Sequence, residues 1–265
     1  MIVGHSLSRL ELSQVTLCAV TSVNVVATVR ALEHSMAQIE FGACKLFTDA
    51  EIVPTLMGID VIKIPRLSSI ADYSNFVLKL LVDQIDTSHC LITQWDGHVV
   101  DASKWQPAFL DFDYIGARWP QFMDGHDVGN GGFSLRSRRL MEACKSPEFQ
   151  PSDAEDTAIA RINRDWLEGR GMRFASGVMA DKFSAEREGS IQSSFGFHGV
   201  WHMPDVIGAD SFWDVYLKLN DRRTVWNDLF KLAALLSQNP RGLRRAARLI
   251  ADQLRDAIQK RMKML

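Results

Sequence analysis

Residues 15–36 read VTLCAVTSVNVVATVRALEHSM, a short apolar run followed by a helical pattern. The run VTLCAV is rich in β-prone residues and stops at Thr21 and Ser22. From Val23 to Met36 the apolar residues recur at the spacing of one helix face. This order predicts a strand over 15–20 and a helix over 23–36, the first β–α step of an α/β chain.

The same alternation continues along the chain. Strand patterns occupy 43–48, 60–64 and 89–93, and a helical pattern over 71–85 follows the second of them, with Asp72 as its expected N-cap. The stretch 89–93 is almost wholly apolar, as is typical of a strand covered by helices on both faces. The sequence therefore predicts an α/β fold with a mainly parallel, doubly wound sheet flanked by helices.

Later segments predict a second, smaller part. From residue 111 the sequence changes to a glycine-rich turn that leads into a strand and a helix, and a further helix is predicted over 157–166. Residues 213–265 are helical by pattern. We expect a main α/β domain over 1–205 and a C-terminal helical extension over 206–265.

Composition narrows the classes of function. With 265 residues, 46% of them hydrophobic, the chain can bury one large core and a helical appendage. Its net charge of −2 argues against nucleic acid as a partner. The four cysteines are widely spaced without a CxxC pair, which predicts buried free thiols in a reducing compartment. Neither a secretory signal nor a membrane span is apparent, so we expect a cytoplasmic protein that is soluble or peripheral.

Ligands of doubly wound sheets bind beyond the carboxyl ends of the strands, so the residues there are the first candidates for a site. Thr21, Ser22 and Asn24 follow the first strand, Thr48 and Asp49 the second, and Gln94–His98 the strand over 89–93. A carboxylate at Asp96 could hold a divalent cation against a pyrophosphate. The alternative is an ordinary turn residue or helix cap.

A glycine-rich stretch is the second candidate for a ligand-binding segment. Gly129–Ser137 reads GNGGFSLRS, and its glycines would let the backbone approach a ligand closely, with the amide of Asn130 free to bond. The alternative is a hairpin turn before an edge strand. The spacing fits neither GxGxxG nor GxxxxGK[ST], which disfavours dinucleotide-binding and P-loop sites.

Two further stretches carry titratable groups. Asp153–Asp156 opens the predicted helix at 157, where its acids either complement the helix dipole or supply a general base. His198, within Phe195–Gly199, is either a structural histidine or a nitrogen ligand that would join Asp96 on Mn²⁺. His198 and His202 lack the glutamate of HExxH, which disfavours a zinc hydrolase.

In this order and spacing the motifs resemble those of GT-A glycosyltransferases. The resemblance is closest to an uncharacterised glycosyltransferase-like domain family marked by QWDG, DYIGAxW, GNGGFSLRS, an ED pair and a late FxFHG, and it spans about 15–201. It implies a Rossmann-like GT-A sheet and a transferase of hexosyl type. The motifs lie at Gln94–Gly97, Asp113–Trp119, Gly129–Ser137, Glu155–Asp156 and Phe195–Gly199.

The resemblance also implies roles for single residues. GT-A enzymes usually end the fourth strand with a DxD motif whose last aspartate holds the metal, which points to Asp96. Gln94 stands at the place of the first aspartate, so one carboxylate is missing and His98 becomes a further candidate ligand. His198 resembles the third ligand of a Mn²⁺ or Mg²⁺ ion, and Asp156, beside Glu155, resembles the base of an inverting transfer. The expected donor-site residues are Thr21, Asn24, Gln94, Trp95, Asp96, Asn130, Gly131 and Gly132.

The expected partners follow from these roles. The donor would be a nucleotide diphosphate sugar, with a UDP-sugar foremost, and the acceptor a hydroxyl group of a glycan or glycolipid in polysaccharide or lipopolysaccharide biosynthesis. A nucleotidyltransferase is disfavoured because no glycine-rich, lysine-bearing loop follows the first strand. A catalytically silent carbohydrate-binding or scaffold domain stays open, because Gln94 removes a metal carboxylate.

The last 25 residues, from Arg241 to Leu265, form a basic amphipathic pattern. Eight basic residues stand against two acids, and apolar residues recur at helical spacing. The segment either lies on an anionic membrane surface, at the inner face of the membrane, or packs on the catalytic domain with a solvated basic face. The apolar positions are Leu243, Ala247, Ile250, Leu254 and Ile258.

Overall fold

The predicted β–α step is present in the computed structural model, which describes residues 9–238 and 242–262. Strand β1 (Leu10–Val20) leads into helix α1 (Val25–Met36). The strand begins earlier than its apolar run because Leu10 and its polar neighbours pair with β2 at a partly exposed end of the sheet. An exposed strand end needs no apolar residues, so hydrophobicity alone does not reveal it.

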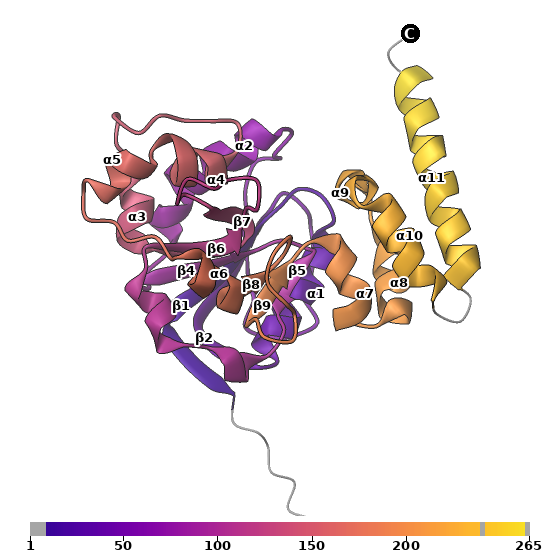
Figure 1. Cartoon of the computed structure of the whole chain (residues 1–265), viewed down its shortest axis with the longest axis horizontal. Helices are drawn as coiled ribbons and strands as arrows, with labels where there is room; N and C mark the ends of the chain where they lie inside the picture. Colours follow the sequence, from indigo (N-terminus) through magenta and orange to yellow (C-terminus); the bar gives the residue numbers. More distant parts are fainter. Residues whose placement is uncertain (1–8, 239–241, 263–265) are drawn as a thin grey trace, which may run out of the picture. The chain divides into compact units, whose positions relative to one another are not determined.

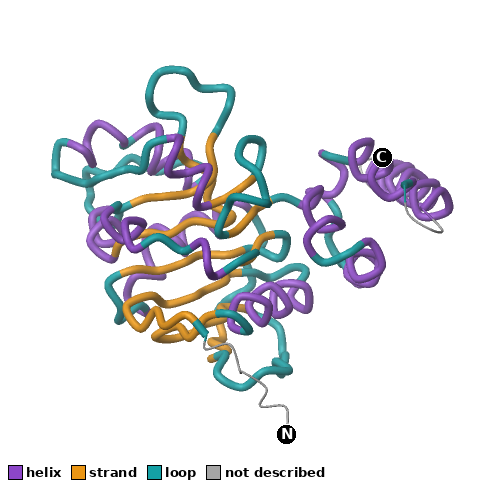
Figure 2. The backbone as a smooth tube through the Cα atoms, turned by 60° about the horizontal axis from the view of Figure 1, so that its bottom comes forward, coloured by secondary structure: helices purple, strands orange, loops and turns teal. Residues whose placement is uncertain are grey.

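A six-stranded sheet has the order β3-β2-β1-β4-β7-β6. Figure 2 shows the strands in orange, lying side by side. Strands β1 to β4 are parallel, β7 runs antiparallel to β4, and β6 antiparallel to β7. The strand predicted over 89–93 is confirmed with the same bounds. The remaining strands are β2 (Ile39–Thr48), β3 (Asp60–Lys63), β4 (His89–Thr93), β6 (Tyr114–Arg118) and β7 (Val128–Ser137).

Helices cover both faces of this sheet. Because side chains alternate along a strand, Leu17 packs in a core with Leu32 of α1, whereas Cys18 packs in another core with Phe76 and Leu81. Figure 1 shows α1 and α2 (Ile70–Asn75) on either side of the strands. The predicted α/β fold with a mainly parallel sheet flanked by helices is confirmed.

The helix predicted over 71–85 is divided. After α2 comes a π-helical segment, η1 (Phe76–Leu80), and then a 3₁₀ turn, η2 (Leu81–Gln84). Asp72 is not the N-cap: Ser69 is, accepting from the Asp72 amide at 3.0 Å while the Asp72 carboxylate accepts from the Ser69 amide. This reciprocal capping box places Asp72 at the third helical position.

The helix predicted over 157–166 is divided in the same way. It begins as α4 (Glu155–Thr157), widens into the π-helical η5 (Ala158–Ile162) and resumes as α5 (Arg164–Glu168). A π turn changes the spacing by one residue, which apolar periodicity does not register.

Short elements complete the first part of the chain. A second sheet, of order β5-β9-β8, lies beyond the end of β4. Its strands are β5 (Gly97–Val99), β8 (Ser184–Ala185) and β9 (Gly196–His198), and the other elements are η3 (Ala102–Lys104), η4 (Pro107–Asp111), α3 (Arg138–Ala143) and α6 (Gly177–Phe183).

The predicted free thiols are confirmed. Cys18, Cys44, Cys90 and Cys144 are all buried and form no disulfide. Burial raises the pKa of Cys44 and of Cys144 to about 12, which keeps both thiols protonated at neutral pH.

The chain divides into two compact units, Met1–His198 and Gly199–Leu265, where we expected a boundary at 206. The second unit is helical in its described residues, and none of the described helices is long and apolar enough to cross a membrane. Its elements are η6 (Val200–His202), α7 (Met203–Val206), α8 (Ala209–Lys218), α9 (Arg223–Asn227), α10 (Leu229–Ser237) and α11 (Gly242–Met262).

Candidate active site

Asp96 and His198, more than 100 residues apart in sequence, meet beyond the end of β4. Asp96 Oδ1 lies 3.5 Å from His198 Nε2. Both atoms are buried, and neither has a hydrogen-bond partner among the described residues. Buried polar atoms are normally satisfied, so such a facing pair needs an explanation.

Strand pairing brings the two residues together. Asp96 directly precedes β5, and β9 runs antiparallel to β5 with Gly97 opposite His198. The end of β9 therefore carries the imidazole to the carboxyl end of β4, where the ligand sites of such sheets form.

Glu186 completes the cluster, and no motif in the sequence pointed to it. It follows β8, which pairs in parallel with β9, and its Oε1 lies 3.2 Å from His198 Nδ1. Burial opposes the charge on His198, but the carboxylates of Asp96 and Glu186 outweigh it and raise the pKa of His198 to about 10. The sequence carried no signal for it, because β8 consists only of Ser184 and Ala185, neither of which is β-prone.

The pair fits a divalent cation. Ligand atoms lie about 2.0–2.2 Å from such an ion, so neighbouring ligands are separated by about 3 Å, close to the observed spacing. A carboxylate oxygen and an imidazole nitrogen form a donor set that Mn²⁺ accepts. Glu186 on the far imidazole nitrogen would fix the ring orientation, as partners of metal-bound histidines commonly do.

His98 does not belong to this cluster. It alternates with Gly97 along β5 and so lies on the opposite face from His198. Its ring stacks on His34 of α1, with 4.7 Å between centroids, and contacts Phe197 edge-on. Burial lowers the pKa of His98 to about 4, so it stays neutral.

The glycine-rich stretch was expected as a turn, and that expectation is wrong: Gly129–Gly132 lies inside β7, an inner strand of the sheet. A Cβ atom on Gly132 would lie 2.1 Å from His198 Nε2, and one on Gly131 would lie 2.2 Å from Glu155 Oε1. Because Gly132 and Gly131 have no side chains, the His198 ring and the Glu155 carboxylate can lie directly against β7. Asn130 Oδ1 accepts from the Gly132 amide at 2.9 Å, and the Gly132 carbonyl accepts from the Gln94 amide at 2.9 Å.

The ED pair has two different environments. Glu155 is buried, and both of its oxygens lie within 3.0 Å of Arg136 Nη2, itself buried on β7. Asp156 is half-buried, and its Oδ2 accepts from the Gly131 amide at 3.2 Å. Asp156 and His198 thus contact consecutive residues of β7.

The remaining donor-site candidates lie at or near the strand ends. Thr21 donates its hydroxyl to the Val23 carbonyl at 2.5 Å, and Asn24 precedes α1 with a φ of 53°, a left-handed conformation that asparagine tolerates. Both follow β1, the sheet neighbour of β4. Trp95 is 7% exposed and mostly covered by the core.

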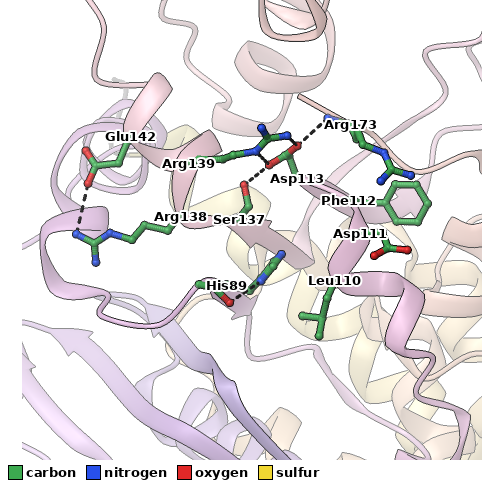
Figure 3. A pocket seen from close by; sticks show the side chains of 11 residues that line it. His89, Leu110, Asp111, Phe112, Asp113, Ser137, Arg138, Arg139, Glu142 and Arg173 are labelled. Carbon is green, nitrogen blue, oxygen red and sulfur yellow. Dashed lines mark hydrogen bonds and ion pairs between the residues drawn. The ribbon is translucent and has the colours of Figure 1, made fainter. Parts of the chain in front are cut away.

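A cavity of about 600 Å³ lies at the opposite edge of the sheet (Figure 3). It is lined where β4 and β6 begin and β7 ends, so it is separate from the Asp96 cluster. Asp113 lies in its wall, bound by Ser137, by Arg139 and, at 2.8 Å, by the Arg173 amide.

Fold and site together define an α/β protein with a candidate cation site at the carboxyl edge of its parallel strands. The chain belongs to the family described as "Protein of unknown function (DUF5672)", whose model matches residues 57–198. No curated protein matches it in sequence.

Several solved structures are similar to the chain at low identity. A glycosyltransferase involved in the glycosylation of the major capsid of PBCV-1 has 10% identity and a TM-score of 0.45, covering 77% of this chain and 98% of that one. S. aureus TarS 1-349 in complex with UDP-GlcNAc has 14% identity and a TM-score of 0.41, covering 87% and 74%. HddC from Yersinia pseudotuberculosis has 15% identity and a TM-score of 0.37, covering 60% and 87%.

Proposed function

We propose that the chain is a glycosyltransferase that moves a sugar from a nucleotide diphosphate sugar to a hydroxyl group of a glycan or glycolipid. The observation that carries the proposal is the buried pair of Asp96 Oδ1 and His198 Nε2, which face each other at 3.5 Å beyond the end of β4 without a hydrogen bond from any other described residue. The order of motifs shared with GT-A glycosyltransferases supports the same conclusion.

In this proposal Asp96 and His198 hold Mn²⁺ or Mg²⁺. The ion would neutralise the negative charge that grows on the nucleoside diphosphate as it leaves. Glu186 acts as a positioning residue, because it contacts His198 on the nitrogen away from Asp96. Thr21, Asn24, Gln94 and Asn130 are the proposed contacts of a UDP-sugar.

Asp156 is the proposed general base of an inverting transfer. As the bond between the anomeric carbon and the phosphate breaks, the acceptor oxygen bonds to that carbon and its proton passes to the Asp156 carboxylate. The Gly131 amide, 3.2 Å from Oδ2, keeps this carboxylate against β7. We assign Glu155 a positioning role, because its oxygens are bound by Arg136.

Titration calorimetry with UDP and Mn²⁺ tests the metal site. Wild type is expected to bind UDP in a Mn²⁺-dependent way, and Asp96→Ala to bind at least about 100-fold more weakly. Asp86→Ala, which removes a carboxylate that is 94% exposed, serves as the matched control and should bind as wild type does. Metal-independent UDP binding that survives in Asp96→Ala would contradict the proposal.

A second candidate is a catalytically silent carbohydrate-binding or scaffold domain, favoured by Gln94 where a DxD carboxylate would stand. A screen of sugar nucleotides for metal-dependent hydrolysis separates the two. The transferase should hydrolyse one donor slowly, and Asp156→Asn should reduce that rate by about 10²–10⁴-fold while UDP binding persists. Binding of UDP without hydrolysis of any donor would favour the silent domain.

A further inference from the structure

Helix α11 carries an exposed apolar stripe. Leu243, Leu254, Ile258 and Met262 are 77%, 55%, 61% and 70% exposed, and Ile250 is 40% exposed. At 100° per residue these five side chains fall within an arc of about 120°. We call these five residues the apolar stripe.

The opposite face of α11 accounts for how the helix is held. Leu249 is fully buried, and Asp252 accepts from the Tyr216 hydroxyl of α8 at 3.0 Å. Arg245 bonds to the carbonyl of Ala209, also in the second unit. Residues outside the apolar stripe therefore hold α11 in the second unit, and the stripe is not needed to keep the helix in place.

Arginines border the stripe. Arg244, Arg248 and Arg255 lie along one edge of it on the helical wheel, and Arg261 lies near its C-terminal end. Arg248 and Arg255 bond to Asp252 but remain 53% and 60% exposed. Within the described part of the chain, Arg244 and Arg261 take part in no ion pair. The exposed side of the helix is thus apolar and basic together.

We infer that α11 is a membrane-surface helix, lying along an anionic bilayer with the apolar stripe among the lipid chains and the arginines at the phosphate groups. An amphipathic helix with a basic border is what such an interface binds. A second copy of the chain fits less well, since stripe-to-stripe packing would bring the arginine borders together without acidic partners. The inference does not rest on the proposed transferase activity.

Sedimentation of the full chain with vesicles tests it. Vesicles of phosphatidylcholine with about one third phosphatidylglycerol are compared with pure phosphatidylcholine. Wild type should bind the anionic vesicles and lose most of that binding in high salt. Ile250→Ser/Leu254→Ser/Ile258→Ser should bind them roughly 100-fold more weakly, since three half-exposed apolar side chains no longer enter the bilayer. Arg244→Gln/Arg261→Gln should weaken binding roughly 30-fold.

The matched control is Val53→Ser/Met57→Ser, which removes two apolar side chains that are 93% and 95% exposed in the first unit. It should bind vesicles as wild type does, and circular dichroism should show every variant folded. Vesicle binding that the triple variant retains would overturn the inference. Absence of vesicle binding by wild type would also overturn it. If analytical ultracentrifugation then showed a dimer that the triple variant abolishes, the stripe would instead contact a second copy of the chain.

Discussion

At the scale of single residues, the absence of a side chain at Gly132 decides how close the His198 imidazole lies to β7. A Cβ atom there would come within 2.1 Å of Nε2, the atom that faces Asp96. Ring and strand cannot both keep their places around such a contact, so the spacing between Asp96 and His198 depends on this glycine.

Gly132→Ala is therefore expected to abolish Mn²⁺-dependent UDP binding while destabilising the fold by about 1–3 kcal/mol, the usual cost of overpacking. Calorimetry and urea unfolding measure the two effects. Gly169→Ala is the control, because its added methyl would meet its nearest atom at 3.2 Å, far from the cluster. Unchanged UDP affinity in Gly132→Ala would show that the imidazole is not part of the binding site.

Sequence reasoning selected Asp96 and His198, and the structure brings them within 3.5 Å. It did not select Glu186, which reaches His198 only because β8 pairs with β9. That pairing involves two residues of β8, too short a run to be recognised from hydrophobicity. Side chains that are brought together by such short strands can be identified only in the folded structure.

At the scale of elements, the ion pair of Arg136 and Glu155 joins β7 to α4. Their side chains are 1% and 5% exposed. Burial raises the pKa of Glu155, and the nearby Arg136 guanidinium offsets only part of that rise. Removing one partner would leave the other buried without a counter-charge, which is far worse than removing both.

Arg136→Met should lower the free energy of unfolding by about 3–5 kcal/mol, and Arg136→Met/Glu155→Leu should recover a large part of the loss. Arg138→Met breaks a pair of 3.4 Å between half-exposed side chains of α3 and is expected to change stability by less than about 0.5 kcal/mol. Urea unfolding of all variants is the measurement. Equal effects of Arg136→Met and Arg138→Met would contradict the role given to the buried pair.

The start of β6 carries a pH-dependent contact, visible in Figure 3. Burial alone would raise the pKa of Asp113, but hydrogen bonds from Arg139, Ser137 and the Arg173 amide hold it below its ordinary value. A carboxylate with a depressed pKa stabilises the fold above its unfolded pKa of about 4, and this contribution is lost as the pH falls through the lower folded pKa.

Asp113→Asn should therefore be less stable than wild type at neutral pH, and the difference should shrink as the pH falls below about 4. Free energies of unfolding at several pH values give the comparison. Asp86→Asn, at an exposed position, should track wild type throughout. A difference for Asp113→Asn that stays constant with pH would rule out this contact as its source.

Secondary-structure elements were predicted best where both faces of the element are buried. Strand β4 has the predicted bounds because every residue after His89 is buried and apolar or a buried threonine. The segments 71–85 and 157–166 contain π turns that apolar spacing does not report. Gly129–Gly132 was expected as a turn because three glycines in four positions are typical of one, yet here the close approach of His198 and Glu155 requires glycines within β7.

At the scale of the whole molecule, the candidate site and the apolar stripe belong to different compact units. Every proposed site residue lies in Met1–His198, and the stripe lies in Gly199–Leu265. The variant Ile250→Ser/Leu254→Ser/Ile258→Ser is therefore expected to keep its Mn²⁺-dependent affinity for UDP in solution. Calorimetry without vesicles tests this, and a clear loss of affinity would mean that the second unit contributes to donor binding.

The arrangement of the whole chain was the most predictable level. Alternation of strand and helix patterns fixes a mainly parallel sheet because parallel strands need crossover connections. A strand after the glycine-rich stretch was predicted, but its antiparallel direction and the antiparallel strand β6 were not, since glycine spacing and short apolar runs carry no sign of strand direction.

The distribution of cysteine makes thiol reactivity a specific probe of the first unit. All four thiols are buried within the first unit, and the second unit contains none. A thiol reagent can reach them only when that unit opens, so its rate of reaction reports the opening of the first unit. Melting of the helices after Gly199 would pass unseen by the reagent, which lets the two halves be followed separately in one unmodified chain.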